Sequence, residues 1–540
     1  MFSSRGIRNA ALIVLSGVAV GLLWLIPRTD ADNAHLESGQ IDVRTDHALG
    51  AISPLIYGMG LEWVENGNRM LDPQTGHLRP EILELLKPLR IPVWRFPGGI
   101  LADYYVWRDG VGRRERRPKR ENPIGGTVYE NNFGTDEFIS LCRALGSEAL
   151  ITANYGTGSL QETLAWQQYF KSRQFPVRYW EIGNEIYLTE PRKSAAIPGN
   201  DARIFHTASD YAKDFRQWAQ GLRAADPNVL VGAVAGTRDH TSSQHRDWLD
   251  VLLANSGSEI DFVALHNSFA PMIFGKYNYE DREKRFDAYR AMWAQPLLSA
   301  EDTHIVRERL RKTYPDTPQR IAVTEHFPLF GGGGPKDQIL SILDQSRTLA
   351  AALYTAGLLH SFMREKVWMA NYNIATSRWF GALLTDTDNG LIRTPTYYLY
   401  DLYRNHFGDA LLEVDTRSPN FNSPKVGSVP RRNTVSYLDA VASTDAKGSI
   451  FLAVINRHLE ESVEATVRIA GLPAGAPADV YTLDGPAPNS INGPSLTQTV
   501  SGGSPDNIEV KHSSWTASDK TYKFPAHSVT ILKWQRSPAT

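Results

Sequence analysis

Cysteine is nearly absent from this sequence, because Cys142 is the single one in 540 residues. A lone cysteine excludes an intrachain disulfide and a cysteine-based zinc site. Cys142 lies within the amphipathic helical pattern of residues 138–145, which predicts a small, buried apolar residue. No neighbour in the sequence would lower the pKa of its thiol, so a thiol nucleophile is not expected.

An excess of charge of either sign is also missing. The 57 Lys and Arg residues nearly balance the 59 Asp and Glu residues, which leaves a net charge of −2. This balance gives no electrostatic reason to expect nucleic acid as a partner. The basic run at residues 113–120 is expected to be a solvated loop. Its alternative role is contact with an acidic polysaccharide or a membrane surface.

The N-terminus carries the features of a targeting segment. Arg5 and Arg8 precede an unbroken apolar run over residues 10–26. The length of the run lies between that of a signal-peptide core and that of a membrane span. Residues 1–32 are therefore expected to be a signal peptide or a membrane anchor. The positive flank places the rest of the chain outside the cytoplasm, as a secreted, periplasmic or inner-membrane-anchored protein.

From residue 54 to residue 409, short apolar runs alternate with segments of helical periodicity. Eight strands with intervening helices over this length predict the α/β class, in the form of an eightfold β/α (TIM) barrel. The expected strands are 54–62, 92–97, 148–155, 177–184, 228–235, 261–268, 320–326 and 366–373. The expected helices are 78–89, 133–146, 159–173, 208–225, 245–254, 279–312 (in two pieces), 337–362 and 396–407.

After residue 410 the helical periodicity stops. Short alternating runs follow, separated by Gly, Pro, Asn and Ser, and they predict a C-terminal antiparallel β-sandwich domain over residues 410–540. Residues 33–53 read as an extended lead-in strand that joins this sandwich.

Polar residues follow the apolar part of most expected barrel strands, which is where a β/α barrel places its active site. Two of them are carboxylates: Glu185 ends the strand at 177–184, and Glu325 ends the strand at 320–326. A pair of carboxylates can run glycoside hydrolysis, with retention of configuration when the carboxyl groups are about 5–5.5 Å apart. The other strand-end candidates are Glu62, Arg95, Asn154, Asn184, His266, Asn371 and Asn373.

Several motifs add a resemblance to a known family. Residues 180–185, Trp-Glu-Ile-Gly-Asn-Glu, resemble the acid/base strand of clan A glycoside hydrolases. Residues 94–99, Trp-Arg-Phe-Pro-Gly-Gly, and the segment 102–112 that follows resemble family 51, the α-L-arabinofuranosidase family. Ile56-Tyr57-Gly58 and the segment 394–407 resemble the first and last barrel segments of the same family.

The resemblance implies a retaining exo-glycosidase that acts on an oligosaccharide or polysaccharide, with an arabinofuranoside as substrate. It implies that Glu185 is the acid/base and Glu325 the nucleophile. Substrate binding or support is expected of Glu62, Arg95, Asn184 and His266. Structural roles remain open for three of these residues. Glu62 could be a solvated acid, and His266 could be a core histidine. Arg95 could be a structural arginine at the barrel mouth, a position from which it would also orient Glu325.

The chain departs from the family pattern at Ile100, at Asn267-Ser268 and at Thr376. These departures leave two alternatives open: an endo-glucanase or another clan A β-glycan hydrolase, and a non-catalytic carbohydrate-binding protein on a hydrolase frame. No cofactor is expected, and the spacing of His240, His245 and His266 matches no standard metal site. The oligomeric state is left open.

Overall fold

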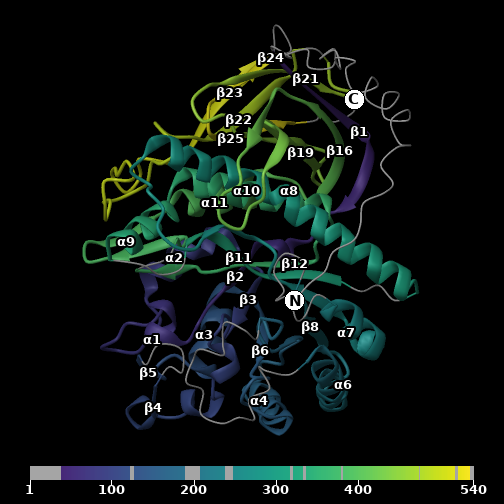
Figure 1. The fold of residues 1–540 in the computed structure, drawn as a ribbon, viewed down its shortest axis with the longest axis vertical. Coiled ribbons are helices and arrows are strands. Elements are labelled where there is room, and N and C mark those ends of the chain that lie inside the picture. The colour runs from purple at the N-terminus through teal and green to yellow at the C-terminus, as the bar shows by residue number, and fades with distance from the viewer. Residues whose placement is uncertain are drawn as a thin grey trace, which may run out of the picture. The chain divides into compact units, whose positions relative to one another are not determined.

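The structure is a computed structural model, and Figure 1 shows its ribbon. It describes residues 38–121, 127–188, 207–236, 247–316, 320–331, 336–378, 381–473, 475–516 and 521–535. The expected targeting segment at residues 1–32 therefore lies outside the described residues. Among those that are described, no helix has both the length and the apolar character needed to span a bilayer.

Eight parallel strands close into a barrel. Each pairs with the next, and the last, β12, pairs with the first, β2. This confirms the predicted eightfold barrel. In order around the barrel the strands are β2 (Gly58–Gly60), β3 (Val93–Phe96), β6 (Glu148–Ala153), β7 (Tyr179–Ile182), β8 (Leu230–Val234), β9 (Phe262–Leu265), β11 (Arg320–Gly331) and β12 (Met369–Tyr372).

Helices connect the strands and pack against the barrel (Figure 1). Hydrogen-bonding side chains fix where several of them begin: Ser159 caps α4, and Thr207 caps α6 in a capping box with Asp210. The main helices are α2 (Pro80–Leu86), α3 (Thr135–Leu145), α4 (Leu160–Ser172), α6 (Ala208–Ala225), α7 (Trp248–Ser256), α8 (Arg282–Thr313), α9 (Lys336–Gln345), α10 (Leu349–Arg364) and α11 (Pro395–His406).

The structure differs from the prediction in several elements. Residues 54–57, expected as strand, form a 3₁₀ helix, because Pro54 occupies its first position and Ser53 caps it. The segment expected as two helices at 279–312 is one helix, α8, which contains Pro296. Conversely, 337–362 divides into α9 and α10 at Thr348, which caps α10. An unpredicted strand, β10 (Phe269–Ile273), pairs with the far end of β11.

The C-terminal part of the chain is a mostly antiparallel β-sheet domain, and residues 39–51 belong to it as strand β1. β1 lies between β16, to which it is antiparallel, and β21, to which it is parallel. Alternating side chains such as Ile41 and Val43 on β1 and Leu452 on β20 are buried in its core. The strands of this sheet are β1 (Gly39–Ala51), β16 (Ala410–Arg417), β19 (Leu438–Thr444), β20 (Ile450–Asn456), β21 (Val463–Ile469), β22 (Pro477–Leu483), β23 (Val510–Thr516), β24 (Thr521–Phe524) and β25 (Ser528–Trp534).

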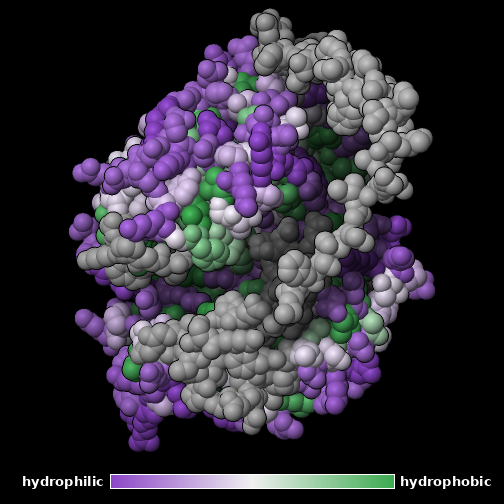
Figure 2. Space-filling view, viewed as in Figure 1, coloured by the Kyte–Doolittle hydropathy of each residue, from purple (hydrophilic) through white to green (hydrophobic). Residues whose placement is uncertain are grey.

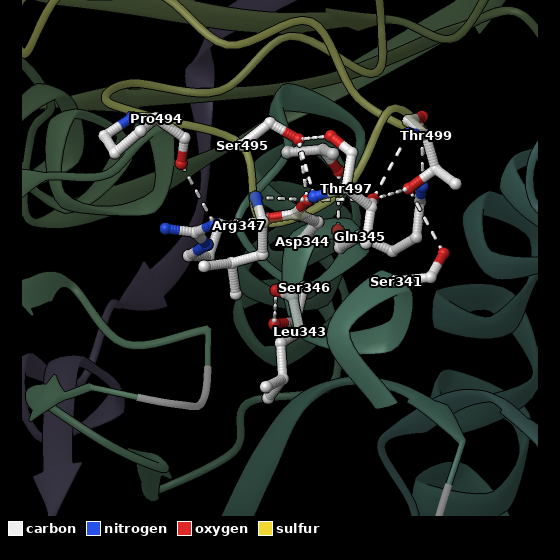
Figure 3. A network of polar contacts seen from close by, with 12 residues as sticks. Ser341, Leu343, Asp344, Gln345, Ser346, Arg347, Pro494, Ser495, Thr497 and Thr499 are labelled. Carbon is white, nitrogen blue, oxygen red and sulfur yellow. Dashed lines mark hydrogen bonds and ion pairs between the residues drawn. The ribbon is translucent and has the colours of Figure 1, made fainter. Parts of the chain in front are cut away.

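Two buried acids join the barrel helices to the sheet domain. Asp439 on β19 forms ion pairs with Arg364 of α10 and Arg457. Asp344 of α9 receives hydrogen bonds from the backbone N–H groups of Leu496 and Thr497 and from the Ser495 hydroxyl, all in the long loop between β22 and β23 (Figure 3). The described part of the molecular face in Figure 2 is mostly hydrophilic, whereas Asp344 and Asp439 are buried and therefore need the partners named above.

Candidate active site

Two of the side chains expected at the strand ends, Glu325 and Asn184, contact the same arginine. Arg95 lies on β3, and the residue is 1% exposed. Its Nη1 donates to Oε2 of Glu325 at 2.9 Å, and its Nη2 donates to Oδ1 of Asn184 at 2.7 Å. A planar guanidinium presents its N–H groups in fixed directions, so these contacts set the orientation of both partners.

A β-bulge places Glu325 at the mouth of the barrel. The register between β11 and β12 shifts between Val323 and His326. An extra residue at such a point re-aims the side chains that follow it. Glu325 is therefore available to Arg95, and its Oε1 also accepts a hydrogen bond from Nδ2 of Asn373 at 3.3 Å.

His326 faces the opposite way from Glu325. Its ring is fully buried between the rings of Phe362 on α10 and Tyr372 on β12. Burial lowers the pKa of this imidazole to about 3, so it stays neutral at ordinary pH. This position indicates a structural role for His326.

Glu185 follows β7 in the left-handed backbone region, with φ of 50°. Its Oε1 lies 3.0 Å from Nδ1 of His266, which follows β9. The side chain of Glu185 is 17% exposed and that of Glu325 is 11% exposed, whereas His266 is 3% exposed. Both carboxylates are therefore partly exposed, and the buried histidine contacts one of them.

Glu62 lies close to Glu325. Burial and the negative charge of Glu325 together raise its pKa to about 7. Its backbone N–H donates to Oδ1 of Asn68 at 2.7 Å, and Thr376 donates to the Asn68 carbonyl at 2.6 Å. Gly99 permits this position of Glu62, because a Cβ there would come within 2.3 Å of Oε1.

Sequence reasoning missed the buried acid Glu181. It is fully buried on β7 and accepts hydrogen bonds from Arg95 Nε at 2.8 Å, Thr152 at 2.8 Å and Thr324 at 2.5 Å. The signal was present in the alternation of β7: Trp180 packs outward on Trp166 of α4, so Glu181 must face the barrel interior. A buried acid there requires a partner such as Arg95.

Other strand-end residues have structural roles. Asn154 accepts hydrogen bonds from the backbone of Thr157 and Gly158 and so stabilises a turn. Asn371 is buried and donates to the Met59 carbonyl on the neighbouring strand. A further buried acid, Asp103, accepts from the backbone N–H of Asn184 at 3.0 Å and holds the end of β7.

The departures from the family pattern lie in different surroundings. Asn267 is buried and donates to the Ser299 carbonyl and to Thr303 on α8, and Ser268 shares a hydrogen bond with the Ser299 hydroxyl. Both side chains are therefore satisfied by α8. Ile100 differs, since it is 40% exposed.

Metal binding finds no support in the residues that the structure covers, where no group of three or more His, Cys, Asp or Glu could hold an ion. His240 and His245 lie outside the described residues. Cys142 is buried on α3, and burial raises the pKa of its thiol.

Comparisons with known proteins give a consistent assignment. A family model described as "Alpha-L-arabinofuranosidase C-terminal domain" matches residues 336–528, and one described as "Alpha-L-arabinofuranosidase 1 domain" matches residues 85–172. An "Intracellular exo-alpha-L-arabinofuranosidase" of Bacteroides ovatus is 27% identical over 463 residues, which are 80% of this chain and 84% of that protein. A "Probable alpha-L-arabinofuranosidase C" of Aspergillus niger is 26% identical over 92% of this chain and 98% of its own length.

Solved structures agree with these relatives. The arabinose complex of an α-L-arabinofuranosidase from Thermotoga maritima superimposes with a TM-score of 0.72 at 25% identity, covering 92% of this chain and 100% of that one. The family 51 α-L-arabinofuranosidase of Thermotoga petrophila gives a TM-score of 0.73 at 26% identity, with the same shares of both chains covered.

Proposed function

We propose a mechanism and a substrate for this chain, which is an α-L-arabinofuranosidase-like glycosidase of glycoside hydrolase family 51. It removes a terminal α-L-arabinofuranosyl residue from an oligosaccharide or polysaccharide by double displacement, with Glu185 as acid/base and Glu325 as nucleophile. The observation that carries the proposal is Arg95, which holds the Asn184 next to Glu185 and also holds Glu325. One rigid guanidinium thus orients Glu325 directly and holds the residue next to Glu185.

In the first step a carboxylate oxygen of Glu325 attacks the anomeric carbon. The glycosidic C–O bond breaks, and Glu185 transfers its proton to the departing oxygen. The leaving alcohol is released, and the sugar stays attached to Glu325 as an ester. Arg95 and Asn373 direct N–H groups at the two oxygens of Glu325 and so orient it for attack.

In the second step Glu185 acts as a base. It removes a proton from a water molecule, whose oxygen attacks the anomeric carbon and displaces Glu325. The sugar leaves with its original configuration, and both glutamates return to their starting states. This mechanism requires the two carboxyl groups to be about 5–5.5 Å apart.

Glu62 and Asn184 bind the sugar in this proposal. With its pKa near 7, Glu62 can either donate or accept a hydrogen bond at a sugar hydroxyl, according to its protonation. Asn184 presents an amide whose orientation is set by Arg95. His266 contacts Glu185 and lies almost fully beneath the surface, so it supports the acid/base and does not bind the substrate directly.

Action on a β-glycan is a second candidate, favoured by the exposed Ile100 in place of a polar residue. An apolar side chain at that position removes one hydrogen-bonding group for a furanoside. Export to the periplasm or beyond is also proposed, on the apolar run at residues 10–26.

A panel of aryl glycosides, with furanosides first, tests the substrate, and Glu185→Ala and Glu325→Ala test the roles. Glu185→Ala should lose far less activity on a substrate with an acidic phenol than on a natural glycoside, and azide should accelerate its second step. Glu325→Ala should lose roughly 10⁴-fold or more on both substrates. The reverse pattern would exchange the two roles, and activity on β-glucans alone would replace the proposed substrate.

A further inference from the structure

We propose that Glu181 is a positioning residue which, through the Thr324 hydroxyl, fixes the tautomer of His266 and thereby the proton shared by His266 and Glu185. Glu181 does not touch the substrate, because it is fully buried beneath Arg95. The part that concerns Glu185 rests on the function proposed above. The part that concerns the tautomer follows from hydrogen-bond directions alone.

Glu181 sets the direction of the hydrogen bond that it forms with Thr324. Its Oε2 accepts from Arg95 Nε and from the Thr152 hydroxyl, each at 2.8 Å. A carboxylate has no proton of its own to donate. The remaining oxygen, Oε1, lies 2.5 Å from the Thr324 hydroxyl, so Thr324 must be the donor in this contact.

The second direction follows from the single proton of a hydroxyl group. Since Thr324 gives its proton to Glu181, its oxygen can act only as an acceptor toward other groups. Nε2 of His266 lies 3.0 Å from that oxygen. Nε2 therefore carries a proton, and in the neutral imidazole the other nitrogen, Nδ1, is an acceptor.

The contact between His266 and Glu185 then requires a single proton between the two groups. Nδ1 of His266 faces Oε1 of Glu185 at 3.0 Å, so one proton is shared between them. Either Glu185 is protonated beside a neutral ring, or the ring is an imidazolium beside an ionised Glu185. The first state is an acid ready to protonate a leaving group, and the second is a base ready for water.

Two further groups near Glu181, Arg95 and Tyr211, already have partners of their own. Arg95 donates to Glu181 through Nε and to Glu325 through Nη1. Among the hydrogen bonds named above, Glu325 is therefore connected to the relay only through Arg95. Tyr211 of α6 lies near Glu181, but it donates its proton to the Ile182 carbonyl at 2.7 Å, and burial raises its pKa well above the usual range. Neither group competes for the Thr324 proton.

The relay is tested by NMR of ¹⁵N-histidine-labelled full-length protein. The signal that disappears in His266→Asn identifies His266, and its two ring nitrogens report which one carries the proton. Wild-type protein should show a protonated Nε2. In Glu181→Gln the amide N–H₂ group can donate to Thr324, which then donates to Nε2, so the proton of the neutral ring should move to Nδ1.

Two buried threonines provide a matched pair of variants that leave the charges unchanged. Thr324→Val breaks the relay, whereas Thr152→Val removes a hydroxyl from the same carboxylate on the side away from His266. The proposal expects the ¹⁵N signals of His266 to change in Thr324→Val and to stay as in wild type in Thr152→Val. Equal changes in both variants, or a wild-type ring protonated on Nδ1 alone, would overturn it.

The pH dependence of kcat/KM gives a second readout, which a merely structural role would not move. In Glu181→Gln a protonated Nδ1 would stabilise ionised Glu185, so the basic limb should move to lower pH by about one unit. An unchanged limb would contradict the proposal. Failure of the proposed function would look different: Glu185→Ala would keep full activity on poor leaving groups, and the tautomer result would still stand or fall by itself.

Discussion

Nη1 of Arg95 donates a 2.9 Å hydrogen bond to Oε2 of Glu325, while Nε of the same guanidinium is bound by Glu181. The arginine therefore carries one positive charge between two carboxylates of different exposure. Glu181 is fully buried, whereas the side chain of Glu325 is 11% exposed. The position of Arg95 therefore depends on Glu181, and the position of Glu325 depends on Arg95.

Arg95→Lys should reduce kcat/KM by about 100-fold or more, because an ammonium group cannot reproduce three directed contacts. The measurement is steady-state kinetics on an aryl arabinofuranoside. Arg108→Lys is the matched control, since Arg108 pairs with Glu162 at the surface. Equal activity of Arg95→Lys and wild type would show that the charge alone suffices and that the contacts to Asn184 and Glu325 do not orient the site.

Glu62 should make the folded protein less stable as the pH rises. Its pKa is about 7 in the folded state against 4.5 for an unperturbed glutamate, so the folded state binds the extra proton between these values. This contribution to stability is complete below pH 4.5 and is lost as the pH rises through 7. Its size is on the order of 2 kcal/mol after allowance for partial exposure.

Glu62→Gln removes this dependence. The melting temperature of the variant, relative to wild type, should therefore increase between pH 5 and pH 8. Glu121→Gln, at an exposed position, is the control and should show a constant difference. A difference between Glu62→Gln and wild type that stays constant across this range would contradict the raised pKa of Glu62.

The sequence predicted the barrel because the signals of its strands are local. Apolar runs such as 148–153 and 179–182 have the length and composition of strands, and the polar residues after them mark the mouth of the barrel. Glu185 and Glu325 are recognisable in this way. Their roles stay predictions until the variants are measured.

What the sequence did not reveal depends on contacts between distant segments. Glu181 reads as one residue of an apolar strand, and only the approach of Arg95 and Thr324 explains its charge. β10 forms because β11 extends far enough to pair with it, which residues 269–273 do not indicate by themselves. The helix at residues 54–57 reflects capping by Ser53 overriding strand-forming side chains.

Asp344 should control the long loop between β22 and β23 (Figure 3). This buried acid accepts from the N–H groups of Leu496 and Thr497 at 2.8 Å each and pairs with Arg347. Asp344→Ala leaves the Arg347 charge buried without its partner and releases the loop, at a cost of about 3–5 kcal/mol. Limited proteolysis should then cut within residues 484–505.

Asp388→Ala is the control for this change, because Asp388 pairs with Arg378 at the surface and should alter neither stability nor cleavage. Asp344→Asn keeps one acceptor oxygen, so its stability and its rate of cleavage should lie between those of Asp344→Ala and Asp388→Ala. If Asp344→Ala were cut no faster than Asp388→Ala, the loop would be held by other contacts.

The N-terminal segment and strand β1 should respond in opposite ways to truncation. Residues 1–32 are proposed to act in export, so a protein that begins at residue 33 should fold and keep full activity. β1 begins at Gly39 and fills the space between β16 and β21. A protein that begins at residue 53 loses both ladders and the buried Ile41 and Val43, and it should unfold or aggregate.

The comparison separates targeting from folding, because the two truncations differ only by residues 33–52. Circular dichroism and activity on an aryl arabinofuranoside measure the folded state, and cell fractionation of the full-length chain measures export. The protein that begins at residue 33 should be found in the cytoplasmic fraction, since it lacks the apolar run at residues 10–26. Loss of folding on removal of residues 1–32 alone would show that this segment belongs to the folded domain, and export without it would refute its targeting role.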